Sequence, residues 1–66
     1  MEVVINGKPR QAAATLSLAQ AVALLTDAET GVAAAVNGDV IRRAAWAATP
    51  LSDGDEVEVL TAVQGG

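Results

Sequence analysis

The part of this sequence with the most distinctive chemistry stands at its end, where Leu60 to Gly66 read LTAVQGG. Glycine has more conformational freedom than any other residue, so Gly65-Gly66 holds structure poorly. Such an end is either a frayed terminus without a role or a narrow segment that carries the α-carboxylate of Gly66 into a confined site on another protein. The residues and elements before it decide between these interpretations.

Few side chains are available for catalysis. The 66 residues contain no cysteine and no histidine. This composition excludes thiolate metal sites and cysteine nucleophiles, and it removes the commonest general base. Carboxylates, hydroxyls and Lys8 would remain for an active site, so we expect a chain that is acted on by enzymes and is not one itself. The sequence also lacks a glycine-rich phosphate loop, so we expect any ATP site to lie on a partner.

The charge of the chain is acidic. Eight acidic and four basic residues give a net charge of −4. This charge opposes binding to nucleic acids and anionic membranes, and it suits a partner with a basic docking surface. The opening Met1 to Ile5 is too short for a signal peptide, and no apolar run approaches the roughly 20 residues of a membrane span. We therefore expect a cytoplasmic protein that binds neither nucleic acid nor membrane.

The sequence opens with the pattern of a β-hairpin. Residues 2–5 are mostly apolar and meet Asn6-Gly7, a dipeptide that accepts the positive φ values of a tight turn. A return strand is expected over residues 8–12. Because Pro9 cannot donate a ladder hydrogen bond, this strand is placed at the edge of a sheet.

A helix follows the hairpin. Apolar residues recur at helical spacing from Leu16 to Leu25, which predicts one amphipathic helix. Its first residue follows either Thr15 or Ser17. Ser17 with Gln20 three residues later matches a capping box, and the two starts differ by about half a turn.

The second half of the sequence predicts another hairpin and a short crossover. Residues 32–36 place Val32, Ala34 and Val36 at alternating positions and are followed by Asn37-Gly38. This pattern predicts a strand, a tight turn and a return strand over residues 39–42. Residues 43–48 are expected to form an irregular or one-turn helical crossover. We expect Trp46, the single aromatic residue, to be a core anchor in this crossover and not a platform for a ligand.

The clearest alternation in the chain comes last. After a turn cluster at residues 50–55, the strand over residues 56–61 places Val57 and Val59 inward and its two glutamates outward. A right-handed connection through the helix lets the first and last strands lie parallel in the middle of a sheet. This order predicts an α+β fold, the β-grasp or ubiquitin-like roll, with a mixed sheet of four to five strands and one main helix across one face. Residues 1–61 would form the domain and residues 62–66 a flexible tail.

Several segments together resemble one family, the sulfur carrier proteins of thiamine biosynthesis known as ThiS. No single segment is decisive, because Asn-Gly occurs in any hairpin, but the ordered set spans nearly the whole chain. The matching segments are the first strand closing on Asn6-Gly7, Val36-Asn37-Gly38, Arg43 three residues before Trp46, the run from Leu51 through Asp53-Gly54-Asp55 to Val57-Glu58, and the final Gly65-Gly66.

The resemblance implies a chemical role for the tail. The carboxylate of Gly66 would be adenylated with ATP by an enzyme of the ubiquitin-activating type and then converted to a thiocarboxylate, with sulfur from a donor such as a cysteine desulfurase. Thiazole synthase would take the sulfur for the thiazole ring of thiamine. Gly65 and Gln64 would thread into the partner site, and the chain itself would bind no cofactor and no metal. The alternatives are a carrier of the molybdopterin synthase small-subunit type, a ubiquitin-like protein modifier, and a β-grasp interaction module without chemistry.

A docking surface is expected beside the tail. Leu60 and Ala62 fall on the outward side of the last strand, and we expect Leu60 with Val63 to contact the adenylating enzyme. The alternative is that a neighbouring strand covers half of Leu60.

Two sets of charged residues have alternative roles. Arg43 would pair either with a carboxylate of a partner or with Asp39, and a structural role is favoured. An acidic group close to the last strand either forms a solvated rim or steers a basic partner toward the tail. The group consists of Asp53, Asp55, Glu56 and Glu58.

Overall fold

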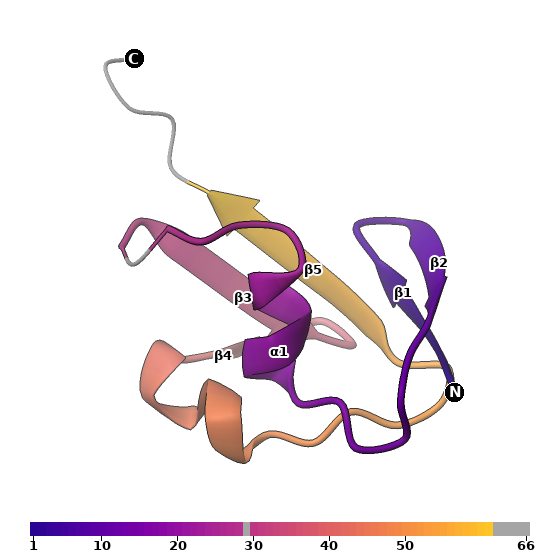
Figure 1. Ribbon diagram of the computed structural model, residues 1–66. Helices are drawn as coiled ribbons and strands as arrows, with labels where there is room; N and C mark the ends of the chain where they lie inside the picture. The colour runs from indigo at the N-terminus through magenta and orange to yellow at the C-terminus, as the bar shows by residue number, and fades with distance from the viewer. Residues whose placement is uncertain (29, 62–66) are drawn as a thin grey trace.

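Five strands form one mixed sheet in the order β2-β1-β5-β3-β4, and one helix crosses one of its faces (Figure 1). The structure is a computed structural model that describes residues 1–28 and 30–61. The elements, in chain order, are β1 (Glu2–Ile5), β2 (Lys8–Gln11), α1 (Leu18–Ala23), β3 (Val32–Val36), β4 (Asp39–Ile41), the 3-10 helix η1 (Arg43–Ala48) and β5 (Glu56–Thr61).

Both predicted hairpins are confirmed. Asn6 and Gly7 have φ values of 52° and 81°, and Asn37 and Gly38 have values of 50° and 87°. Two successive positive φ values are the mark of a type I′ turn, whose twist matches that of the strands it joins. The strand that contains Pro9 lies at the edge of the sheet, as the missing amide hydrogen requires.

The central pair of strands defines the fold. β1 runs parallel to β5, with Val4 opposite Glu56 and Ile5 opposite Val57. β5 runs antiparallel to β3 over the whole length of β3, from Val57 opposite Val36 to Thr61 opposite Val32. The predicted β-grasp is therefore confirmed, with five strands.

Helix α1 begins at the second of the two predicted starts. The Ser17 hydroxyl accepts a hydrogen bond from the Gln20 amide at 3.2 Å, and the Gln20 side chain accepts one from the Ser17 amide at 2.9 Å, which completes a capping box. The predicted range, from Leu16 to Leu25, was too long at both ends, because the helix ends at Ala23. The Leu16 carbonyl instead accepts a hydrogen bond from the Leu51 amide at 3.0 Å, because the chain before the helix pairs with the segment that follows η1.

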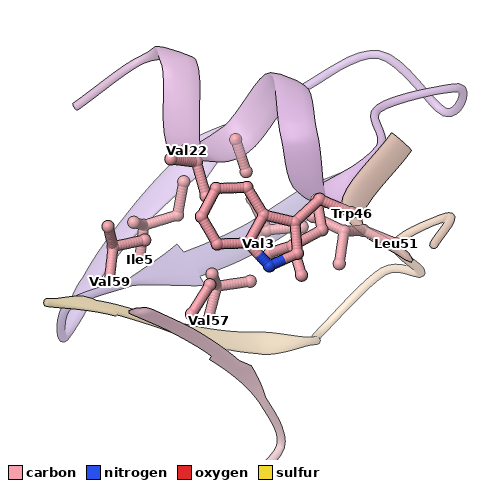
Figure 2. Close-up of a cluster of buried hydrophobic side chains, with 10 residues drawn as sticks. Val3, Ile5, Val22, Trp46, Leu51, Val57 and Val59 are labelled. Carbon is pink, nitrogen blue, oxygen red and sulfur yellow. The ribbon is translucent and has the colours of Figure 1, made fainter. Parts of the chain in front are cut away.

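The core lies between the sheet and the two helices. Figure 2 shows Trp46 at the centre of the buried cluster, with Val3, Val57 and Leu51 around it. Trp46 is 5% exposed, and its indole N–H donates a hydrogen bond of 2.7 Å to the Ile41 carbonyl. The prediction of a core anchor is confirmed. Leu51 is 4% exposed, although its position in a turn cluster gave no sign of burial.

The first testable prediction concerns this anchor. Trp46→Phe should lower the free energy of unfolding by about 1–3 kcal/mol, because it leaves a cavity and removes the hydrogen bond to Ile41. Urea denaturation followed by far-ultraviolet circular dichroism measures the change, since the variant has no tryptophan fluorescence. Val40→Ala serves as the control and should be nearly neutral, because Val40 is 79% exposed. Equal losses in both variants would contradict the assignment.

Candidate functional site

The last strand leads directly into the tail, which carries the predicted reactive carboxylate. β5 ends at Thr61, and the tail residues Ala62, Val63, Gln64, Gly65 and Gly66 lie outside the described residues, as does the predicted domain boundary at residue 62. The structure therefore defines the base of the tail and the surface around it.

β5 separates two faces with different properties. Val57 and Val59 point into the core and are nearly fully buried, whereas Glu58 and Leu60 point to the outer face of the sheet, away from the helix. This alternation follows from the pleat of a strand, which turns successive side chains to opposite faces. Leu60 is 66% exposed. Its predicted outward direction is confirmed, and the alternative of half coverage by a neighbouring strand is wrong.

Leu60 belongs to a wider exposed apolar surface. Leu60 lies opposite Ala33 on β3, and Val40 on β4 lies opposite Ala35. We call these four residues the outer apolar patch. The side chains of the two alanines are small and leave the surface low beside Leu60 and Val40. Shallow hollows flank Leu60 on both sides. Sequence reasoning missed Val40 and the alanines, because only the pairing of β3 with its two neighbours brings them beside Leu60.

The acidic group divides into two pairs. One carboxylate oxygen of Asp53 accepts a hydrogen bond from the Glu2 amide at 2.7 Å, and Asp55 accepts one from the Ser52 amide at 2.7 Å. These two aspartates stabilise the turn before β5 and are therefore more than a solvated rim. Glu56 and Glu58 are exposed on the outer face, where they can interact with a basic partner.

Asparagine side chains hold β5 at two places, its first residue Glu56 and Val59. Asn37 Oδ1 accepts a hydrogen bond from the Glu56 amide at 2.9 Å, and Asn37 Nδ2 donates one to Asp55 at 3.1 Å. Asn6 Oδ1 accepts a hydrogen bond from the Val59 amide at 2.8 Å, and Asn6 Nδ2 donates one to the Val59 carbonyl at 3.1 Å. Sequence reasoning assigned both asparagines to turns alone, because nothing local to an Asn-Gly dipeptide predicts bonds to a strand so distant along the chain.

The side chain of Arg43 lies over the ring of Trp46. Its guanidinium lies 5.2 Å from the centre of the Trp46 ring, which is a cation–π distance. This partner differs from the two that the sequence suggested, Asp39 and a carboxylate of another protein. A structural role for Arg43 was favoured, and the contact over the core anchor supports it.

Two features are absent from residues 1–28 and 30–61. Within these ranges, no cluster of three or more metal-binding side chains of the His, Cys, Asp or Glu types occurs. None of the helices there is long and apolar enough to cross a membrane.

The fold and the site define a class of protein. A mixed sheet built around a parallel central pair, one helix across it, and a last strand that leads to a Gly-Gly sequence are the features of the ubiquitin-like β-grasp proteins. A model of the ThiS family matches residues 3–66. The chain therefore belongs to the ThiS family, the sulfur carrier proteins of thiamine biosynthesis, and the resemblance in the sequence is confirmed.

Individual relatives agree with this assignment. The chain is 27% identical over 66 residues to the sulfur carrier protein ThiS of Escherichia coli strain K12, and the alignment covers the whole of both chains. It is 36% identical to the thiamine biosynthesis protein ThiS of Geobacter metallireducens, whose crystal structure superposes with a TM-score of 0.79 and full coverage of both chains. A solution NMR structure of a thiamine biosynthesis protein from the same organism gives a TM-score of 0.80 at 36% identity, covering all of this chain and 88% of the other.

The second prediction follows from the two faces of β5. Leu60→Asp should change the free energy of unfolding by less than about 1 kcal/mol, because the side chain is already in contact with water. Val59→Asp is the matched control on the adjacent position, and it should unfold the domain because it buries a carboxylate in the core. Thermal denaturation followed by circular dichroism distinguishes them. A large loss of stability in Leu60→Asp would show that the outer face is not free.

Proposed function

We propose that the α-carboxylate of Gly66 carries sulfur as a thiocarboxylate and donates it for the thiazole ring of thiamine. The observation that carries this proposal is the family match, which runs to residue 66 and so includes both glycines. The alignment with the Escherichia coli sulfur carrier protein, which covers both chains completely, supports it. In this role the chain is a cosubstrate of partner enzymes.

The chemistry requires activation, because a carboxylate is a poor electrophile. One oxygen of Gly66 attacks the α-phosphorus of ATP, and pyrophosphate leaves. Sulfide then attacks the carbonyl carbon of the acyl adenylate. Where a cysteine desulfurase supplies the sulfur as a persulfide, a thiol reductant must bring it to the level of sulfide. With sulfide as the nucleophile, the bond to AMP breaks, one proton is released, and the thiocarboxylate remains. The ATP site belongs to an adenylating enzyme of the ubiquitin-activating type.

Glycine suits the last two positions for steric reasons. The carboxylate must enter a recessed site on the partner, where a Cβ atom would meet the walls of the channel. Residues 62–66 can span about 17 Å when extended, which is enough to reach such a site. The absence of cysteine from the chain is compatible with this route, because no thiol of the carrier itself can attack the activated carboxylate.

The adenylating enzyme would dock on the outer apolar patch. Leu60 and Val40 are the most exposed large apolar side chains of the described residues, and the patch is continuous with the base of the tail. Exposed apolar surfaces of this kind often mark interfaces. Glu56 and Glu58 border the patch, so the partner surface should combine an apolar centre with basic residues at one side. Val63 and Ala62 would extend the contact along the tail.

Intact mass measurement after incubation with the cognate adenylating enzyme, ATP and sulfide tests the proposed chemistry. Replacement of one oxygen by sulfur supports the carrier. A ladder of conjugates joined through lysine would instead indicate a protein modifier, and no change with competent enzymes would indicate an interaction module. Transfer of the sulfur to the product of thiazole synthase separates the thiamine pathway from that of molybdopterin.

The third prediction concerns the α-carboxylate of Gly66. Addition of one alanine after Gly66 should abolish adenylation, because the reactive carboxylate is moved and a Cβ atom enters the channel. The melting temperature should be unchanged, since the addition alters no residue of the described sheet or core. The control is a chain with one alanine added before Met1, which should load normally. Adenylation of the C-terminally extended chain at the normal rate would contradict the assignment of Gly66.

The fourth prediction concerns docking. Leu60→Asp should raise the KM of the adenylating enzyme for the carrier by about tenfold or more, because an acidic group replaces an apolar contact at the interface. Gln11→Asp adds the same charge on the edge strand β2, away from the patch, and should leave KM within about twofold. Equal KM values for the two variants would place the docking surface elsewhere.

A further inference from the structure

The two Asn-Gly turns bind the same strand at different positions. Asn37 holds the start of β5 through the Glu56 amide, and Asn6 holds its later part through both backbone groups of Val59. The turns are alike in sequence and in backbone conformation, with φ values of 52° at Asn6 and 50° at Asn37. They differ in their distance from the tail, because only Asn6 acts close to Thr61.

The hydrogen bonds from the Asn6 side chain extend the pairing of β5 beyond the end of β1. β1 stops at Ile5, and the last backbone bond on this edge of β5 runs from the Asn6 amide to the Val57 carbonyl at 2.9 Å. On the opposite edge, β3 pairs with β5 as far as Thr61. A side-chain amide has the same donor and acceptor as a peptide group. Asn6 therefore takes the place of the missing strand residue and extends the pairing on this edge to Val59.

We infer that Asn6 is a positioning residue for sulfur loading: its side-chain amide fixes the direction in which the chain leaves β5 at Thr61. The inference rests on the proposed function, because it concerns the delivery of the Gly66 carboxylate. A strand that is paired on one edge only opens and twists more readily than one paired on both. A swing of about 10° at Thr61 displaces the end of an extended five-residue segment by about 3 Å, and displacements of about 1 Å can slow a reaction markedly.

The role predicted for Asn6 differs from docking. Asn6 lies beside Glu56 and Glu58 in a hollow between β1 and β5, at the acidic border of the outer apolar patch, and its replacement removes neither carboxylate and no residue of the patch. Loss of its side chain should therefore leave the affinity for the adenylating enzyme intact. The fraction of bound carriers that hold the carboxylate in the reactive position should fall, which lowers kcat.

Two matched variants test the inference. Asn6→Gly and Asn37→Gly each remove a side-chain amide from β5, and glycine accepts the positive φ at both positions. In steady-state adenylation with the cognate enzyme, Asn6→Gly should lower kcat by about tenfold and leave KM for the carrier within about twofold. Asn37→Gly should leave both constants within about twofold, measured well below the melting temperature of each variant.

A second measurement needs no partner enzyme. Amide hydrogen exchange at Val59 and Leu60, followed by NMR, should be faster in Asn6→Gly than in the parent chain, and unchanged in Asn37→Gly, because Val59 loses its bond to Asn6 and Leu60 lies next to it on β5. This result would show that the Asn6 side chain restrains the end of β5 specifically.

The outcomes separate the inference from the proposed function. A parent chain that the adenylating enzyme does not activate contradicts the proposed function, and the inference falls with it. An active parent with equal falls in kcat for both variants shows general destabilisation and overturns the inference. So does an effect of Asn6→Gly on KM alone. Unchanged exchange at Val59 and Leu60 in Asn6→Gly overturns it regardless of activity.

Discussion

The structure depends on the pairing of β5 along both of its edges. β1 lies parallel to it on one side and β3 antiparallel on the other, so this strand occupies the middle of the sheet. Its inward valines join the core around Trp46, and its outward residues form part of the surface that we assign to docking. The strand then leads to the tail. One element thus connects the stability of the domain, the recognition of a partner and the placement of the reactive carboxylate, because the pleat turns alternate residues to opposite faces.

Much of the fold is predictable from the sequence because its signals are local. The two Asn-Gly dipeptides specify type I′ turns, and the alternation in the last strand specifies its faces. The helix start required a choice between two caps, and the structure selects Ser17. The true extent of the helix and the burial of Leu51 depend on pairing between segments that are distant in sequence, and periodicity within a window of residues carries no information about such pairing.

Less of the candidate site than of the fold could be predicted from the sequence. The outward direction of Leu60 follows from its position two residues after Glu58, and the structure confirms it. Val40 could not be assigned to the same surface, because it reaches Leu60 only across β3. The hydrogen bonds of the Asn6 side chain could not be predicted either, since its partner Val59 lies on a strand at the far end of the chain. The resemblance to ThiS predicted the family, which the comparisons confirm, while the role of the tail stays a proposal.

The central claim is that the α-carboxylate of Gly66 is the group on which the chemistry takes place. Isotope transfer tests it most directly. A chain is prepared by semisynthesis with heavy oxygen at both carboxylate positions of Gly66 and is converted by the adenylating enzyme with ATP and sulfide. One of these oxygens becomes the bridging atom of the acyl adenylate, so we predict that the released AMP carries one heavy oxygen and the thiocarboxylate retains the other. Release of AMP without heavy oxygen would contradict the account.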